Sequence, residues 1–269
     1  MNIRWNLTSR RKLIKKSDIY IFSVAKSGRT WLRVLINKYL SLAYDIPFGL
    51  GDLNKYNKTI LSILFTHELW VHYSIATPRQ KLLGKFIVPN KFLRSKKIVV
   101  LYRDPRDVLV SLFFQKSKRS KTKTRKSITD FISDKRHGID LIVDVMNQWR
   151  ERLENHSNCF WVSYEDLRHD TFTSFKEILN FLNFTVINEE FIQEAIAFAK
   201  FKNMKKMEAG GAFGSKIMRP GDQSDPDSFK VRKGIVGGYV KHFSDEDLRR
   251  LDQAVSRLHP FFGYNHQST

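Results

Sequence analysis

Side chains that bind anions are concentrated in one short turn near the start of the chain. The turn surrounds Gly28 with two cationic and two hydroxyl-bearing residues, Lys26, Ser27, Arg29 and Thr30. An apolar, β-branched run over 19–24 predicts a buried strand before the turn, and helical spacing of apolar residues follows it. A helix leaves its first N–H groups without partners inside it. The turn therefore predicts a phosphate cradle at the positive end of a helix dipole. A plain strand-to-helix turn is the alternative.

A second strand-turn-helix unit has the same character. The run 97–103 predicts a strand, and Asp104 with Pro105 predicts the N-cap and first residue of a helix. Arg103 and Arg106 flank this helix start, so a second anion site is expected. In the alternative interpretation, Arg106 pairs with Asp104 or Asp107 and has a structural role only.

Two further segments carry candidate residues. His67 directly follows a predicted strand over 60–66, and ligands of open α/β sheets bind beyond the carboxyl ends of the strands. An ordinary loop histidine is the alternative. The glycine-rich segment 202–241 predicts a long irregular loop for cofactor or substrate, in which Arg232, Lys233 and Gly234 form a candidate phosphate clasp.

The alternation of predicted strands and helices indicates one α/β domain over residues 1–269. A strand over 160–164 and helices over 139–153, 171–181, 189–201 and 245–258 complete the pattern. This order predicts a doubly wound, mostly parallel sheet with helices on both faces.

The 269 residues carry a net charge of +20, which predicts anionic partners. A basic N-terminal extension over 1–16 and a basic loop over 115–127 hold part of this charge. The loop is either a mobile, solvated segment or a lid that steers substrate.

The sequence lacks a transmembrane run and a signal peptide, and its single cysteine, Cys159, forms no internal disulfide. A cytoplasmic protein without a membrane span is expected.

Three motifs together resemble the sulfotransferases that use 3′-phosphoadenosine 5′-phosphosulfate (PAPS). The segment Lys26-Ser-Gly-Arg-Thr-Trp31 resembles their 5′-phosphosulfate loop, 102–111 their 3′-phosphate motif, and 232–237 their C-terminal nucleotide loop. Phe-Thr-His67 resembles the segment with the catalytic histidine. Tyr164-Glu-Asp-Leu resembles a segment near the adenine. The resemblance implies a P-loop-like fold, and the Arg-containing loop is similar to that of bacterial members.

The resemblance also implies roles. Lys26 would hold the bridging oxygen of PAPS, Ser27 to Thr30 would surround the 5′-phosphate, and Trp31 would stack on the adenine near Tyr164. His67 would be the general base, with Lys26 and Ser111 as further catalytic residues. The 3′-phosphate would be bound by five residues, Arg103, Ser111, Arg232, Lys233 and Gly234. No metal is implied.

The expected reaction is sulfuryl transfer from PAPS, with PAP (3′-phosphoadenosine 5′-phosphate) as product, to a hydroxyl, amine or amide of a small molecule such as a secondary metabolite. The alternatives are a nucleotide kinase or NTPase, which the residue order of the first turn disfavours, and a basic nucleic-acid-binding protein. No nucleic-acid motif accompanies the charge, so nucleic acid is not expected as a partner.

The C-terminal dimerisation motif of the family is not recognisable after Lys241. The oligomeric state is therefore left open.

Overall fold

The computed structural model describes residues 3–120, 123–184, 187–211, 218, 220–231 and 234–265. The chain forms two compact units, each built from two separate segments. The first unit comprises Met1–Tyr102 and Asn155–Phe198, and the second comprises Arg103–Glu154 and Ala199–Thr269. The expectation of a single domain over 1–269 stays a prediction.

The first unit contains a four-stranded parallel sheet in the order β2-β1-β3-β4. The strands are β1 (Ile19–Ser23), β2 (Ile63–Thr66), β3 (Lys97–Tyr102) and β4 (Cys159–Ser163). Every residue of β1 is buried, as its continuous apolar run predicts. Because β2 and β3 lie on opposite sides of β1, the strand order reverses at β1, where ligands of open α/β sheets bind.

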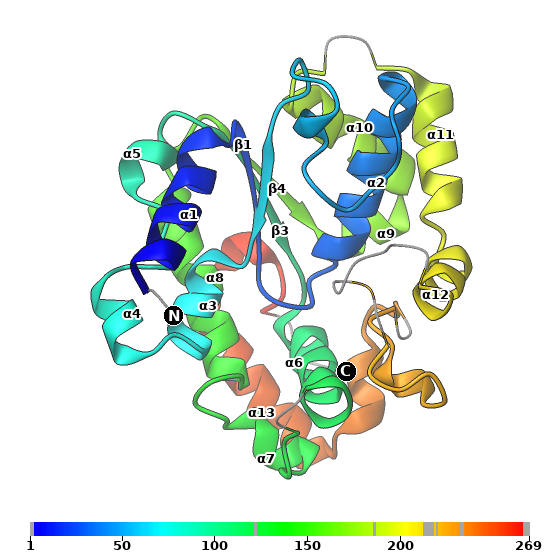
Figure 1. The fold of residues 1–269 in the computed structure, drawn as a ribbon. Coiled ribbons are helices and arrows are strands. Elements are labelled where there is room, and N and C mark those ends of the chain that lie inside the picture. Colours follow the sequence, from blue (N-terminus) through cyan, green and yellow to red (C-terminus); the bar gives the residue numbers. More distant parts are fainter. Residues whose placement is uncertain are drawn as a thin grey trace. The chain divides into compact units, whose positions relative to one another are not determined.

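Helices cover both faces of this sheet. Those of the first unit are α1 (Ile3–Lys16), α2 (Arg29–Ala43), α3 (Glu68–Ser74), α4 (Pro78–Leu82), α5 (Asn90–Leu93), α9 (Tyr164–His169), α10 (Thr171–Phe181) and α11 (Glu189–Phe198), with a 3-10 turn at Leu53–Lys55. In Figure 1, α1 and α5 lie on one side of the strands, and α2, α10 and α11 lie on the other. The predicted doubly wound α/β class is confirmed, and the basic extension 1–16 is largely the helix α1.

The strand expected over 60–66 begins only at Ile63. Side chains occupy the backbone groups of the preceding residues: Asn54 donates to the carbonyl of Ile60 at 2.6 Å, and Asp18 accepts the N–H of Ser62 at 2.9 Å. These side-chain bonds occupy backbone groups that a longer strand would pair in the sheet.

The second unit is helical in the part that the structure describes. Its helices are α6 (Pro105–Phe114), α7 (Ile128–Ile132), α8 (Ile139–Leu153), α12 (Phe201–Ala209) and α13 (Asp245–Val255), with a π-helix at Gln115–Arg119 and 3-10 turns at Pro226–Ser228, Gly238–His242 and Pro260–Phe262. Asp104 caps α6 by accepting the N–H of Arg106 at 2.8 Å, and Pro105 is its first residue, as predicted. Ser244 likewise caps α13.

Two segments of the second unit begin in helices that the sequence did not predict. The irregular segment 202–241 begins inside α12, because its glycines start only at Gly210, where that helix ends. The buried carboxylate of Glu208 then accepts the N–H groups of Lys230 and Val231 at 2.7 and 3.0 Å, which fixes the returning chain.

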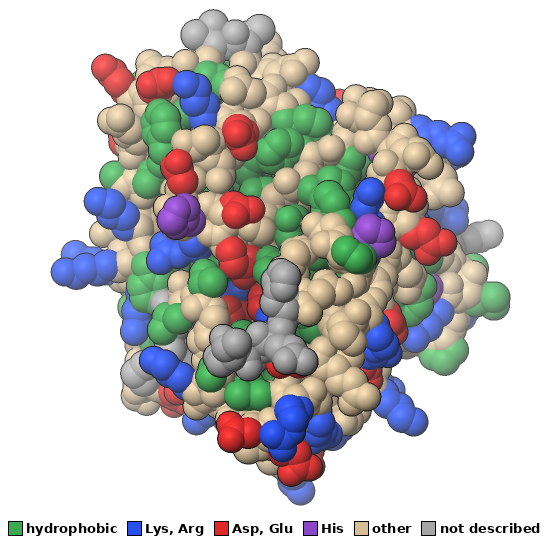
Figure 2. Space-filling model, turned by 180° about the vertical axis from the view of Figure 1, so that it is seen from behind, with side chains coloured by type: hydrophobic (Ala, Val, Ile, Leu, Met, Phe, Trp, Pro, Cys, Tyr) green, Lys and Arg blue, Asp and Glu red, His purple; other side chains and the backbone are tan. Residues whose placement is uncertain are grey.

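The basic segment 115–127 starts as the π-helix that continues α6. Lys118 pairs with Asp225 at 3.2 Å and Lys126 with Asp134 at 2.6 Å, so part of its charge is compensated. On the face drawn in Figure 2, Lys and Arg side chains are interspersed with Asp and Glu. Among the described residues, no helix combines the length and the apolar character needed to cross a membrane.

Candidate active site

The turn between β1 and α2 has the backbone of a tight cradle. Lys26 and Gly28 both have positive φ, 74° and 89°, and Gly28 is the N-cap residue of α2 without any side-chain cap. A Cβ at position 28 would lie 2.5 Å from Cδ2 of Tyr164, so only glycine fits here. Lys26 adopts a left-handed conformation that residues with a Cβ rarely use.

The hydroxyl of Ser27 has the environment expected of a ligand contact. Ser27 is fully buried, and its Oγ has no hydrogen-bond partner among the described residues. A buried hydroxyl without a partner is unfavourable unless a ligand completes its bonding. The first N–H groups of α2 also have no partners within the helix. The turn therefore fits an oxyanion such as a phosphate.

His67 lies beside this turn because of the strand register. Phe22 of β1 pairs with Thr66 of β2, so the next residues, Ser23 and His67, are neighbours at the carboxyl edge of the sheet. Nδ1 of His67 is 2.9 Å from the carbonyl oxygen of Ser23, which can only accept a hydrogen bond. Nδ1 therefore donates, and this tautomer leaves the lone pair on Nε2. A neutral imidazole in this form is suited to accept a proton at Nε2.

Two aromatic side chains pack beside the turn. The rings of Trp31 and Tyr164 meet edge to face, with centroids 5.9 Å apart and an interplanar angle of 68°. The guanidinium carbon of Arg168 lies 5.6 Å from the Trp31 ring. Trp31 extends from the first turn of α2, and Tyr164 is the first residue of α9, directly after β4. These rings can offer flat faces to a planar base.

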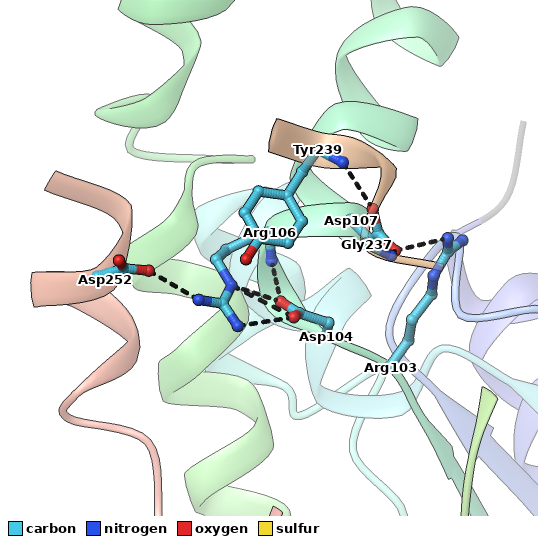
Figure 3. Close-up of polar contacts among 7 residues, drawn as sticks. All are labelled: Arg103, Asp104, Arg106, Asp107, Gly237, Tyr239 and Asp252. Carbon is cyan, nitrogen blue, oxygen red and sulfur yellow. Dashed lines mark hydrogen bonds and ion pairs between the residues drawn. The ribbon is translucent and has the colours of Figure 1, made fainter. Parts of the chain in front are cut away.

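In the second unit, Arg103 and the loop after residue 234 meet at one carboxylate (Figure 3). Asp107 of α6 pairs with Nη2 of Arg103 at 3.1 Å and accepts the N–H groups of Gly237 and Tyr239 at 2.9 and 3.1 Å. Arg103 also donates to the carbonyl of Ile235 at 2.8 Å. Burial raises the pKa of Asp107, and the charge of Arg103 opposes this effect.

Arg106 has the structural role that the sequence offered as its alternative. Its guanidinium pairs with Asp104 at 2.8 Å and with Asp252 of α13 at 2.7 Å, and it lies over the ring of Tyr239 at 4.7 Å. The anion site expected at this helix start stays a prediction, and Arg106 pairs with carboxylates instead.

The remaining predicted residues are placed as follows. Thr30 is in the first turn of α2, and Ser111 lies half-buried on α6, four residues after Asp107 and on the same face. Gly234 has a φ of 63°. Arg232 and Lys233 lie outside the described residues.

Sequence reasoning missed Ser23 and the anchoring role of Asp107. The first follows from a register between two strands, and the second from a contact across 130 residues of sequence. Alternation of strands alone indicates which residues end near one edge of a sheet, but not which side chains meet there.

Comparison with known proteins gives one consistent result. The family model of the sulfotransferase domain matches residues 16–259. Cytosolic sulfotransferase 7 of Arabidopsis thaliana is 29% identical over 265 residues, which cover 88% of this chain and 77% of the relative. An amine sulfotransferase of Oryctolagus cuniculus is 26% identical over 251 residues, with coverages of 89% and 80%.

Solved structures agree on the fold. A mouse sulfotransferase in complex with PAP superposes with a TM-score of 0.63 at 22% identity, covering 95% of this chain and 88% of the other. A retinol dehydratase bound to retinol and PAP gives 0.61 at 19% identity, with coverages of 94% and 85%. The bacterial origin expected from the loop sequence stays a prediction. The chain belongs to the sulfotransferase family and has its P-loop-like α/β fold.

Proposed function

We propose that this enzyme transfers the sulfuryl group of PAPS to a hydroxyl or to an amine or amide nitrogen of a small molecule, and releases PAP. The observation that carries the proposal is the hydrogen bond from Nδ1 of His67 to the carbonyl of Ser23, beside the oxyanion-binding turn. The relatives support a small acceptor, because they include an amine sulfotransferase and a flavonol 3-sulfotransferase.

The donor would be bound through its 5′-phosphate, its adenine and its 3′-phosphate. In the first unit, the Oγ of Ser27 and the backbone of residues 28–30 would bind the 5′-phosphate, and Trp31 with Tyr164 would contact the adenine. In the second unit, the 3′-phosphate would be bound by Arg103, Ser111, Arg232, Lys233 and Gly234. A phosphomonoester carries about −1.5 to −2 charges at neutral pH, so several cations are needed.

When bound, PAPS supplies an activated sulfuryl group. Nε2 of His67 would take the proton of the acceptor as its lone pair attacks, and the carbonyl of Ser23 would stabilise the resulting imidazolium through Nδ1–H. Lys26 would stabilise the negative charge that develops on the leaving phosphate. We also propose a cytoplasmic location, since the relatives are named cytosolic sulfotransferases.

A thermal-shift titration with PAP tests the donor, run beside ATP, ADP and a short DNA at two salt concentrations. A ligand that binds only the native state at 100 times its Kd stabilises by about 2.7 kcal/mol. We expect a shift selective for PAP that Ser27→Ala weakens. A shift with DNA alone that fades at high salt would instead make the protein a nucleic-acid binder.

A further inference from the structure

Three arginines of the first unit gather near His67 on the β2 side of α2. Arg29 and Arg33 are four residues apart on α2 and therefore share a face. The guanidinium of Arg33 lies 4.2 Å from the centre of the Phe65 ring, and its Nη1 donates to the carbonyl of Leu50 at 3.3 Å. Phe65 is a residue of β2, so this face of α2 is turned toward that edge strand.

The third arginine approaches from α1. Nη2 of Arg10 donates to Oγ1 of Thr66 at 3.0 Å, and Thr66 immediately precedes His67. The Arg10 guanidinium also lies 5.3 Å from the centre of the Phe86 ring, and its Nε is buried without a hydrogen-bond partner among the described residues. The Nε–H of Arg10 can therefore donate a hydrogen bond to a ligand.

The charge of this cluster is poorly compensated. Burial, followed by the charges of Arg33 and Arg10, lowers the pKa of Arg29 to about 9. Burial lowers the pKa of Arg33 to about 10, and it lowers that of Arg10 although the carboxylate of Glu68 opposes it. In the part of the chain that the structure describes, none of the three makes an ion pair with Asp or Glu. Partly buried cations of like charge that have no ion-pair partner are unfavourable unless an anion joins them.

We propose that Arg10, Arg29 and Arg33 bind an oxyanion of the acceptor, so that the substrate carries a carboxylate, phosphate or sulfate group beside its nucleophilic hydroxyl or nitrogen. The inference rests on the proposed function and defines its substrate class. Arg10 reaches the residue before the proposed base, so an anion held here leaves the nucleophile of the same molecule near His67.

The same cluster is separate from the adenine-binding residues. Trp31 packs on Tyr164, which follows β4, whereas Arg33 packs on Phe65 in β2 at the opposite edge of the sheet. Arg29 was expected among the residues around the 5′-phosphate, and its backbone N–H keeps that position at the start of α2. Its side chain is assigned to the acceptor because Arg29 lies one turn before Arg33 on the face of α2 that packs on Phe65 of β2.

The test is isothermal calorimetry of inorganic sulfate, used as the probe, with protein saturated with PAP at constant ionic strength. We expect one saturable sulfate site in the wild type, weakened about tenfold or more in Arg29→Gln and in Arg33→Gln, because each removes a charged donor. Arg94→Gln is the matched control, since Arg94 is exposed at the end of α5 and the charge change is identical.

The outcomes are separable because PAP binding is measured first. If the wild type does not bind PAP, the proposed function fails and the acceptor inference with it. Normal PAP binding with no sulfate site, or equal sulfate affinity in all three variants, overturns the inference alone. Loss of PAP binding in Arg29→Gln with unchanged sulfate binding in Arg33→Gln also overturns it, because Arg29 then serves the donor.

Discussion

Removing the charge of Arg29 should make the protein more stable. The pKa of Arg29 falls from its ordinary value of 12.5 to about 9, first through burial and then through Arg33 and Arg10. At about 1.4 kcal/mol per pKa unit, keeping this cation destabilises the folded state by at most about 5 kcal/mol. Because Arg29 is half-buried, water screens part of the effect, and we expect about 1–2 kcal/mol.

The sign of the effect follows from proton binding. Between about pH 9 and 12.5 the unfolded chain holds the Arg29 proton more tightly than the folded protein, so the stability of the wild type rises with pH across that window. Below about pH 9 both states are protonated, and the full destabilisation is present. Arg29→Gln removes this destabilisation, which includes the repulsion from Arg10 and Arg33.

Thermal and urea unfolding at neutral pH and low salt measure the difference. A gain of about 1–2 kcal/mol corresponds to a Tm higher by roughly 2–8 °C in a protein of this size. Arg94→Gln, which changes an exposed arginine, should stay within about 0.5 kcal/mol of the wild type. A lower Tm for Arg29→Gln, or an equal gain in the control, would refute the reasoning.

Four further substitutions probe the site. Gly28→Ala places a Cβ 2.5 Å from the Tyr164 ring at a φ of 89°. We therefore expect the free energy of unfolding to fall by about 1–3 kcal/mol and PAP to bind more weakly. Unchanged stability would show that the turn is not constrained. His67→Ala and Lys26→Ala should each lower kcat by roughly 10²- to 10³-fold with an unchanged Tm, and near-normal turnover would remove their assigned roles. Asp107→Ala leaves Arg103 without this carboxylate and should destabilise by about 3–5 kcal/mol. Burial raises the pKa of Asp107, so the folded protein binds this proton more tightly than the unfolded chain. The stability of the wild type should therefore fall as the pH rises above about 3.8 toward the folded pKa. An identical pH profile in Asp107→Ala would contradict this prediction.

Local chemistry explains what the sequence predicted well. The cap at Asp104, the proline after it and the cap at Ser244 depend on neighbouring residues only, and the structure reproduces them. The turn around Gly28 could also be predicted, because a strand, a glycine and a helix start follow one another within a few residues.

Contacts between distant segments explain what the sequence could not predict. The Ser23 partner of His67 requires the register of β1 against β2, and the position of Arg10 requires that α1 pack against β2. The start of β2 at Ile63 depends on Asn54 and Asp18, which compete for backbone groups of the preceding residues. No local periodicity encodes these pairings.

The carboxylate of Asp107 also couples the local unfolding of the loop around Gly237 to that of α6. It joins α6 to the backbone of Gly237 and Tyr239, so these amide protons exchange with solvent only when the contact to α6 breaks. Their exchange rates should therefore slow or quicken together with those of α6, as one cooperative unit. A loop tied in this way is ordered before a ligand binds, so that less chain entropy is lost on binding.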